Sequence, residues 1–341
     1  MTEAAVVFGV AIFSLLMTGF LRQYALAKNL VDIPNERSSH RVPTPRGGGL
    51  AVVLTFLLCL PAFFLARLID VGGLAGMLGA GAWVALIGHW DDRGSLPAHW
   101  RLIAHFAAAA WALVWLGKLP SLPVFGLDAN LGWFAQILGV VYLVWLLNLY
   151  NFMDGIDGIA GVETITVCCG GALLYWLTVP GGSAWNMPVV LAASASGFLF
   201  WNFPPAKIFM GDVGSGFIGF TMGLMSLHAA QSVPNLFWCW VILLGVFIVD
   251  ATTTLVRRVR RGEKSSDAHR SHAYQYAARK FCAHKPVTLM VGAINLFWLL
   301  PVAAFVGLGY LDGFIGVVIA YAPLIWLAFH FKAGAQELQE I

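Results

Sequence analysis

The sequence predicts an all-α integral membrane protein that crosses the bilayer about eleven times. Two observations lead to this prediction. Of the 341 residues, 59% are hydrophobic and only 11% are charged, whereas about a quarter of the residues of a soluble domain are charged. The apolar residues also come in blocks long enough to span a bilayer, for which about 20 helical residues suffice. We therefore expect a single membrane-embedded domain over residues 1–341.

The apolar blocks are the predicted transmembrane helices. Glycine and proline inside them do not argue against helices, because membrane helices tolerate both. The first block follows Met-Thr-Glu without a basic stretch or a cleavage site, so it is interpreted as a retained helix and not as a signal peptide. The predicted spans cover residues 4–22, 48–66, 71–90, 101–117, 133–150, 159–178, 187–202, 213–230, 237–256, 288–308 and 314–331.

The distribution of lysine and arginine predicts the orientation of the chain. When the loops are assigned alternately to the two sides of the membrane, every lysine and arginine except Arg67 and Lys118 falls on the side that follows the first helix. Basic loops stay in the cytoplasm. We therefore expect a periplasmic N-terminus and a cytoplasmic C-terminus. The five cysteines form no CxxC pair, which argues against a disulfide framework or a zinc site.

Five polar segments, far apart in the sequence, fall on the predicted cytoplasmic side. Because they adjoin different spans but reach the same membrane surface, they predict one composite site that faces the cytosol. The segments are DIPNERSSHRVPTPRGGG (32–49), HWDDRGS (89–95), NLYNFMDGIDG (148–158), NFPPAKIFMGDVGSG (202–216) and RRVRRGEKSSDAHRSHAYQ (257–275).

The segment at 148–158 indicates a metal site. Asn148, Asn151, Asp154 and Asp157 recur every third residue, a spacing that keeps them along one drifting face of a helix. Oxygen ligands without cysteine or histidine suit Mg²⁺ or Mn²⁺. The glycines after the two aspartates would let the backbone approach a ligand or another helix closely.

Carboxylates also stand at two other predicted helix ends. Asp212 precedes a helix in FMGDVGSG, and such a helix start can hold phosphate on its backbone N–H groups. Asp91 and Asp92 are adjacent and would repel one another unless a cation or a basic partner stabilises them. Asp250 is expected to pair with the arginines that follow it, and Glu163 has no predicted role.

Simpler interpretations remain open for single residues. The aspartates could merely cap helices or end them in solvent, and the arginine run at 257–261 could bind anionic lipid instead of a substrate. Six histidines are interpreted as structural: His89, His99, His105, His228, His284 and His330.

Four motifs give the sequence a specific resemblance to a known family. HWDDRGS, NFMDGIDGIAG, FMGDVGSGFIG and the RSH of the basic segment occur in this order and at predicted helix ends. In combination they resemble the polyprenyl-phosphate N-acetylhexosamine-1-phosphate transferases, the WecA-like and MraY-like enzymes of glycosyltransferase family 4. The resemblance extends from about Asp32 to His272, and DIPNERSSHRVPTPRGGG is most similar to the O-antigen-initiating WbpL-like subgroup.

The resemblance implies a reaction, a cofactor and partners. Enzymes of this family transfer a 2-acetamido sugar 1-phosphate from a UDP-N-acetylhexosamine, such as UDP-GlcNAc or UDP-FucNAc, to undecaprenyl phosphate and release UMP. We therefore expect an enzyme of the bacterial inner membrane that initiates O-antigen or cell-envelope polysaccharide synthesis, with Mg²⁺ or Mn²⁺ as cofactor. Its partners would be the lipid bilayer and the two substrates, with a homodimer allowed and no nucleic acid.

The resemblance also assigns residues to roles. The expected metal ligands are Asn151 and Asp212. The expected catalytic residues are Asp91, Asp92, Asp154, Asp157 and His272. The expected substrate-binding residues are His40, Arg46, Asn148, Lys207, His269 and Arg270. The first aspartate of the pair would orient or deprotonate the acceptor phosphate, the aspartates of DGIDG would shape the nucleotide-diphosphate site, and the catalytic histidine would contact phosphate.

The histidine segment departs from the family pattern. Many relatives carry further histidines directly after the position of His272, whereas Ala273 and Tyr274 stand there in this chain. The departure argues against a lipid I synthase, whose histidine cluster is denser. We expect residues 257–287, a cytoplasmic basic loop, to contribute to the site and to read the sugar, which the sequence does not name.

Two other classes of function compete with this interpretation. A secondary transporter would carry ionisable groups near the bilayer midplane, often on inverted repeats, but the acids here gather at one membrane face. A CDP-alcohol phosphatidyltransferase would carry Ala-Arg shortly after its DG motif, which this chain lacks. The transporter is retained as the alternative prediction.

Overall fold

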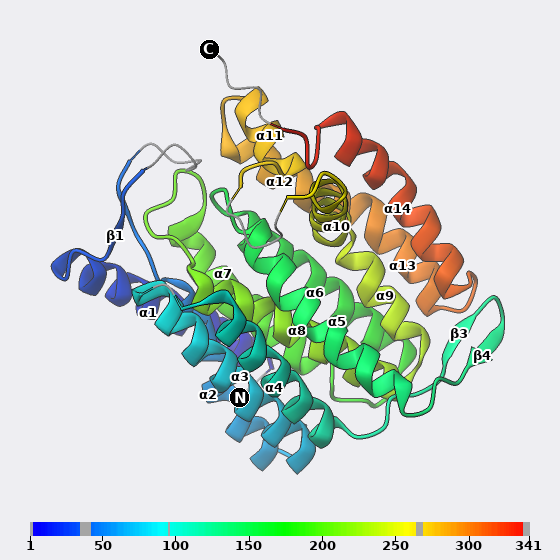
Figure 1. Cartoon of the computed structure of the whole chain (residues 1–341). Helices are drawn as coiled ribbons and strands as arrows, with labels where there is room; N and C mark the ends of the chain where they lie inside the picture. The colour runs from blue at the N-terminus through cyan, green and yellow to red at the C-terminus, as the bar shows by residue number, and fades with distance from the viewer. Residues whose placement is uncertain (1–2, 35–41, 95, 264–268, 337–341) are drawn as a thin grey trace.

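A computed structural model describes residues 3–34, 42–94, 96–263 and 269–336, and in these ranges the chain forms a bundle of helices (Figure 1). The helices are α1 (Glu3–Ala27), α2 (Gly49–Leu65), α3 (Val71–Arg93), α4 (Ala98–Leu116), α5 (Phe134–Met153), α6 (Ile159–Thr178), α7 (Asn186–Asn202), α8 (Asp212–Ser232), α9 (Asn235–Leu243), α10 (Gly245–Arg260), α11 (Ala273–Lys280), α12 (His284–Ile294), the π-helical turn η1 (Asn295–Leu299), α13 (Leu300–Gly307) and α14 (Gly313–His330). The prediction of a mostly helical fold is confirmed.

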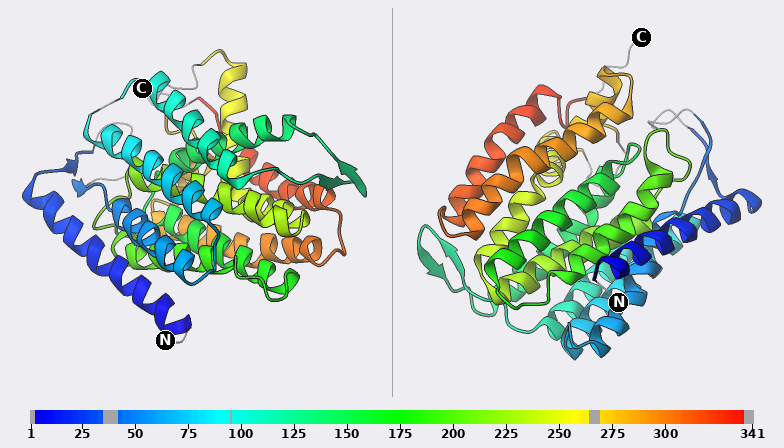
Figure 2. Two further views of the ribbon diagram at one scale, coloured as in Figure 1. Left: turned by 90° about the horizontal axis from the view of Figure 1, so that it is seen from below. Right: turned by 180° about the vertical axis from the view of Figure 1, so that it is seen from behind.

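Two short antiparallel hairpins add strands that the sequence did not predict. Strand β1 (Val31–Asp32) pairs with β2 (Thr44–Pro45), and β3 (Leu122–Val124) pairs with β4 (Leu127–Ala129). Figure 2 shows the β3–β4 hairpin standing out from the helices, away from α11. The β1–β2 hairpin leads into α2 and so directs the loop at 45–49 toward the middle of the bundle.

The described helices support a multi-pass membrane protein, but the count of eleven spans is not confirmed. Seven of them are long and apolar enough to cross a bilayer, or eight if the bent pair α9–α10 is one span. Each predicted span coincides with one helix, with this pair or with the continuous segment α12–η1–α13, yet α2 and α7 have only 17 residues each. The number of crossings and the orientation therefore stay predictions.

Helix α8 lies at the centre of the bundle, between α5 and α3 (Figure 1). Nearly all of its residues are buried. A Cβ on Gly219 would lie 2.5 Å from the carbonyl oxygen of Leu146 on α5, and one on Gly88 of α3 would lie 2.7 Å from Cα of Val213. These glycines permit α8 to pack closely against α5 and α3, because a side chain at either position would push two helices apart.

Helices α9, α12 and α13 pack against α6, and α14 packs against α9 and α10. A bend of 70° separates α9 from α10 and turns α10 toward α11. On α6, Glu163 is fully buried and its Oε2 accepts a hydrogen bond from Nδ2 of Asn295 at 2.7 Å. This contact joins α6 to the π-helical turn after α12 and gives Glu163, for which the sequence predicted no role, a structural partner.

Candidate active site

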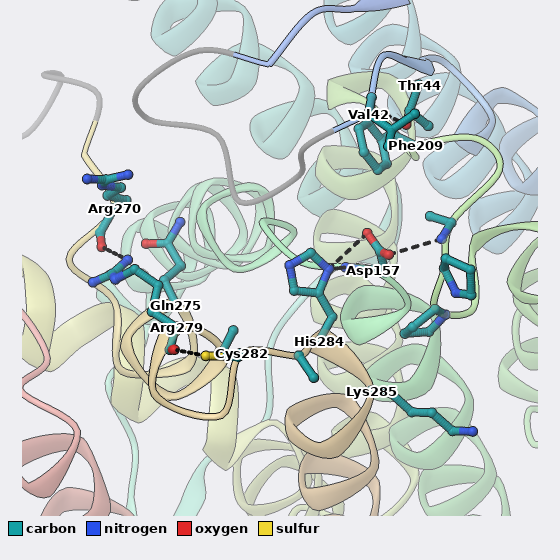
Figure 3. A pocket seen from close by; sticks show the side chains of 15 residues that line it. Val42, Thr44, Asp157, Phe209, Arg270, Gln275, Arg279, Cys282, His284 and Lys285 are labelled. Carbon is teal, nitrogen blue, oxygen red and sulfur yellow. Dashed lines mark hydrogen bonds and ion pairs between the residues drawn. The ribbon is translucent and has the colours of Figure 1, made fainter.

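The site lies where the ends of α3, α5 and α8 meet the loop before α2 and the start of α12. Two adjoining cavities open there. The acidic cavity, of about 240 Å³, is lined by Asp32, Arg46, Asn151, Asp154, Asp157, Asp212 and their neighbours. The basic cavity, of about 810 Å³, is lined by Arg270, Arg279, His284, Lys285 and their neighbours (Figure 3). Their walls share Asp157, Phe209, Gln275 and His284.

Backbone hydrogen bonds hold the loop before α2 against the loop before α8. The amide of Gly48 donates to the carbonyl of Phe209 at 2.8 Å, and the amide of Phe209 donates to the carbonyl of Pro45 at 2.8 Å. This pairing brings Arg46 next to Asp212, although the two residues are distant in the sequence.

Each of the two adjacent aspartates at the end of α3 has its own arginine. Asp91 forms an ion pair with Arg101 of α4, and Oδ1 of Asp92 lies 3.0 Å from Nη2 of Arg46. Arg46 also donates to Oδ1 of Asp212 at 2.8 Å, and Arg101 lies 3.8 Å from its Oδ2. Although burial works against the charged form, the carboxylates of Asp212 and Asp92 raise the pKa of Arg46. Basic partners therefore relieve the expected repulsion.

Asp92 also caps the start of α8. Its carboxylate accepts the backbone N–H groups of Asp212 and Val213 at 2.9 and 3.1 Å. The first N–H groups of a helix lack partners within the helix and attract anions. The sequence suggested that phosphate could bind at this helix start, but in the structure the carboxylate of Asp92 occupies two of these N–H groups.

Of the four polar residues that recur every third position from Asn148 to Asp157, three line the acidic cavity. Asn151 is in the last turn of α5, and Asp154 and Asp157 lie in the turn that follows it. Asn148 is not in the wall, because its amide nitrogen donates to the carbonyl of Val144 in its own helix at 2.7 Å. The helical face that the spacing predicts therefore ends where α5 ends.

The residues of the acidic cavity fit a hard divalent cation. Burial and then the carboxylate of Asp212 raise the pKa of Asp154 well above its ordinary value, so its charged form is disfavoured there unless a cation binds beside it. Within the described ranges, no three His, Cys, Asp or Glu side chains are grouped to hold a metal. Mg²⁺ needs only one or two protein carboxylates when substrate phosphates and water complete its shell, and Asn151 and Asp212 provide oxygen donors in one cavity wall.

The start of α11 packs directly on the DGIDG turn. The hydroxyl of Tyr274 donates to the carbonyl of Phe152 at 3.0 Å, and a Cβ on Gly155 would collide with this hydroxyl. The prediction that a glycine allows close approach at this turn is confirmed for Gly155. Gln275, the next residue along α11, lines both cavities.

Asp157 joins three segments at the boundary between the cavities. Its Oδ1 lies 3.2 Å from Nδ1 of His284, and its Oδ2 accepts the backbone N–H of Ala206 at 3.0 Å (Figure 3). Sequence reasoning missed His284, because a histidine at the start of an apolar helix belongs to none of the motifs.

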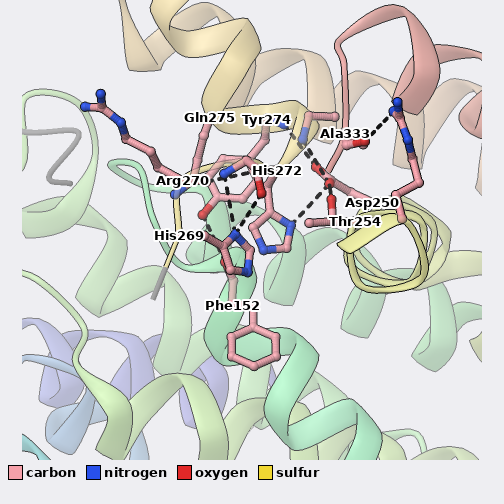
Figure 4. Close-up of polar contacts among 12 residues, drawn as sticks. Phe152, Asp250, Thr254, His269, Arg270, His272, Tyr274, Gln275 and Ala333 are labelled. Carbon is pink, nitrogen blue, oxygen red and sulfur yellow. Dashed lines mark hydrogen bonds and ion pairs between the residues drawn. The ribbon is translucent and has the colours of Figure 1, made fainter. Parts of the chain in front are cut away.

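His272 lies in a second carboxylate–histidine pair, and this pair is away from both cavities. Asp250 of α10 lies 3.2 Å from Nδ1 of His272 and accepts the N–H groups of Ala273 and Tyr274 at 2.9 and 3.0 Å (Figure 4). It also accepts the hydroxyl of Thr254 at 3.1 Å. The prediction that Asp250 pairs with the following arginines is wrong for the described residues, because the start of α11 supplies better-placed donors.

The ring of His269 lies 4.9 Å from that of His272. Burial, and then the neighbouring His272, lower the pKa of His269 to about 3. A neutral imidazole results near pH 7, and it hydrogen-bonds the hydroxyl of Ser271 through Nδ1 at 3.0 Å. His269 and His272 are absent from the walls of both cavities.

Arginines at the end of α10 form hydrogen bonds and ion pairs with other residues of the protein. Arg257 donates to the carbonyl of Ala333 at 2.5 Å. Arg258 and Arg261 both lie 2.7 Å from the carboxylate of Glu263. The contact of Arg257 connects α10 to the segment after α14, and the other two fold the end of α10 onto Glu263, roles that neither of the two interpretations of the arginine run foresaw.

The remaining predicted substrate contacts have different locations. Arg270 lines the basic cavity. Lys207 is exposed with its Nζ 5.6 Å above the ring of Trp201, and it lines neither cavity. His40 lies outside the described residues. The structure adds Arg101 as a partner of Asp91, which the sequence analysis counted only as a basic loop residue.

Comparisons with known proteins identify the family of this chain. The model of glycosyl transferase family 4 matches residues 74–230. A probable undecaprenyl-phosphate N-acetylglucosaminyl 1-phosphate transferase of Bacillus subtilis is 29% identical, over 83% of this chain and 79% of the relative. A decaprenyl-phosphate N-acetylglucosaminephosphotransferase of Mycobacterium leprae is 30% identical, over 82% of this chain and 78% of the relative. This chain belongs to glycosyl transferase family 4.

The family places the protein among the membrane-bound phosphoglycosyl transferases, as the four motifs predicted. A phospho-N-acetylmuramoyl-pentapeptide-transferase of Moorella thermoacetica is also similar, at 30% identity over 47% of this chain and 49% of the relative. These relatives give the transporter alternative no support. The similarity to the WbpL-like subgroup stays a prediction.

Proposed function

We propose that the protein transfers a 2-acetamido sugar 1-phosphate from a UDP-N-acetylhexosamine to undecaprenyl phosphate. The observation that carries the proposal is the pair of adjoining cavities between the end of α5, the loop before α8 and the starts of α11 and α12. A cavity with carboxylates and Arg46 suits a cation and phosphate groups, and the larger cationic cavity has room for the rest of a nucleotide sugar. The names of the relatives supply the substrate class.

The reaction is a displacement at phosphorus. An oxygen of the lipid phosphate attacks the β-phosphorus of the donor and forms the new P–O bond. The bond from this phosphorus to the bridging oxygen breaks, and UMP leaves with the electron pair. Because the lipid phosphate is already largely ionised near pH 7, with a second pKa of about 6 for phosphate monoesters, we favour direct attack over an aspartyl-phosphate intermediate.

The protein's task in this proposal is to position two anions and to balance their charge. Asp91, held by Arg101, would orient the acceptor phosphate, and Asp92 would support it by fixing the start of α8. Arg46 would share its guanidinium between the donor diphosphate and Asp212. Mg²⁺ bound by Asn151 and Asp212 would neutralise charge on the diphosphate.

The products fit a place at the start of a polysaccharide pathway. We propose GlcNAc, FucNAc or a related 2-acetamido sugar as the transferred group, and O-antigen or another cell-envelope polysaccharide as the polymer that it begins. The cytoplasmic face of the bacterial inner membrane is the expected location, because UDP-sugars are cytosolic and the basic loops are predicted to lie there.

The test uses purified protein in detergent with undecaprenyl phosphate, Mg²⁺ and a panel of UDP-2-acetamido sugars. We expect UMP release that stops with EDTA and that one or two donors support. Asp212→Asn should reduce turnover by about a thousandfold or more, because it removes a charge that acts on the reacting phosphates. UMP from no donor, with correctly folded protein, would reject the function, and full activity of Asp212→Asn would reject the role of that residue.

A further inference from the structure

We infer that His284 is a positioning residue for the donor site: it holds the carboxylate of Asp157 in the orientation that donor binding requires. The inference rests on the proposed function and extends it to a residue that none of the motifs contains. It starts from the position of His284 at the first residue of α12, in the walls of both cavities.

The geometry connects His284 to Asp157 twice. Nδ1 of the imidazole lies 3.2 Å from Oδ1 of the carboxylate and 3.4 Å from the backbone nitrogen of the same residue. A protonated Nδ1 donates to the carboxylate, whereas an unprotonated Nδ1 accepts the longer bond from the backbone N–H. Figure 3 shows the ring beside Asp157, in a position from which it can make either contact.

Two further contacts hold the carboxylate and the backbone of Asp157. Its Oδ2 accepts the N–H of Ala206 from the loop before α8, and its carbonyl accepts the hydroxyl of Thr288 at 2.8 Å. Thr288 lies one helical turn after His284, on the same face of α12. The carboxylate is therefore held on one side by the loop before α8, and His284 is the side chain that holds it on the other.

Burial makes this contact stronger than a surface ion pair. The side chains of His284 and Asp157 are 18% and 13% exposed, so water competes weakly for the hydrogen bond. A residue with this burial and with access to two cavities can transmit a change in its own position to a bound ligand. A residue that only packed α12 would have no reason to reach both cavity walls.

Replacement of His284 should therefore affect donor binding before it affects chemistry. Loss of a hydrogen bond between partly buried charged groups corresponds to about a ten- to hundredfold weaker interaction. If Asp157 contacts the donor equally in the ground state and in the transition state, the donor KM rises and kcat changes little.

The experiment compares three variants by UMP release and by melting temperature in detergent. His284→Ala should raise the donor KM about ten- to hundredfold and leave kcat within about threefold. His284→Asn should recover most of the loss, because its amide nitrogen can take the position of Nδ1. His330→Ala is the matched control: it removes an exposed imidazole that stacks on Trp326 and lines neither cavity, and its KM should stay near that of the wild type.

A double-mutant cycle with Asp157→Asn separates positioning from packing. We expect the double variant to lose little more than the worse single variant, because both remove the same contact. An unchanged KM in His284→Ala, or an equal effect of His330→Ala, or a lowered melting temperature that His284→Asn does not restore, would overturn the inference. A wild type that releases no UMP rejects the proposed function instead.

Discussion

Two carboxylate–histidine pairs in this protein share one distance and differ in everything around it. Nδ1 of His272 and Nδ1 of His284 each lie 3.2 Å from an aspartate oxygen. The side chains of the first pair are 3% and 7% exposed, and those of the second are 18% and 13% exposed. Only the second pair lines the cavities.

The difference teaches that the surroundings of such a pair, and not its geometry, indicate what it does. Asp250 uses its oxygens on the first two N–H groups of α11 as well as on His272. It therefore fixes the start of a helix, and the imidazole is one of several donors. Asp157 and His284 instead stand at a boundary that a ligand can reach.

The largest effect that would test this comparison is on stability. Asp250→Ala leaves two buried backbone N–H groups and a buried imidazole without their acceptor, which should cost about 3 kcal/mol or more of folding free energy. We expect a clearly lower melting temperature in detergent. Thr254→Val, which removes only one hydrogen bond to the same carboxylate, is the matched control and should have a smaller effect.

The same measurement on His284→Ala completes the test. Its loss of stability should be well below that of Asp250→Ala, because water reaches the partner that remains. Equal losses in the two variants would mean that the pairs have the same structural role and that the comparison fails.

A smaller effect is expected on the pH dependence of stability, through His269, whose ring stacks on that of His272. His269 has a pKa of about 3 in the folded protein, against about 6.5 in an unfolded chain. Between these values the unfolded chain binds more protons, so the contribution of His269 to stability is present above about pH 6.5 and falls as the pH is lowered. When the pH is lowered from about 7 to about 5, the melting temperature of His269→Gln should therefore fall less than that of the wild type. Identical slopes would show that this imidazole is not held neutral.

The smallest effect is expected outside both pairs. Lys207 is exposed and its ammonium lies over the ring of Trp201, a contact worth about 0.5–1 kcal/mol at an exposed site. Lys207→Ala should leave kcat and the donor KM within about twofold of the wild type. A tenfold rise in KM would return Lys207 to the substrate-binding residues and would show that the cavity walls do not delimit the site.

The sequence predicted the helices and the acidic part of the site because both signals are local. Long apolar blocks indicate helices, and the aspartates at the ends of α3, α5 and α8 stand out against them. What the sequence could not predict depends on contacts between distant segments. Arg101 and His284 are unremarkable in the sequence, and their roles follow from the packing of α4 against α3 and of α12 against the DGIDG turn.

The wrong prediction for Asp250 has the same origin. The arginines that follow it are its neighbours in the sequence, and charge attraction made them the obvious partners. The bend before α10 and the packing of α11 bring a helix start to Asp250 instead. The contact of this helix start with Asp250 depends on how distant segments pack, so this partner could be found only in the structure.

The contact between Glu163 and Asn295 has a consequence for the assembly of the helices. In a bilayer, an apolar helix face attracts lipid as well as another helix, so apolar contacts alone choose poorly among alternative alignments. A carboxyl group has few partners in hydrocarbon, and a slip of α12 by one residue along α6 would leave it without one. Because α6 begins just after Asp157 and α12 begins with His284, the alignment that Glu163 and Asn295 select deep in the bundle also determines which side chains meet at the boundary between the acidic and basic cavities.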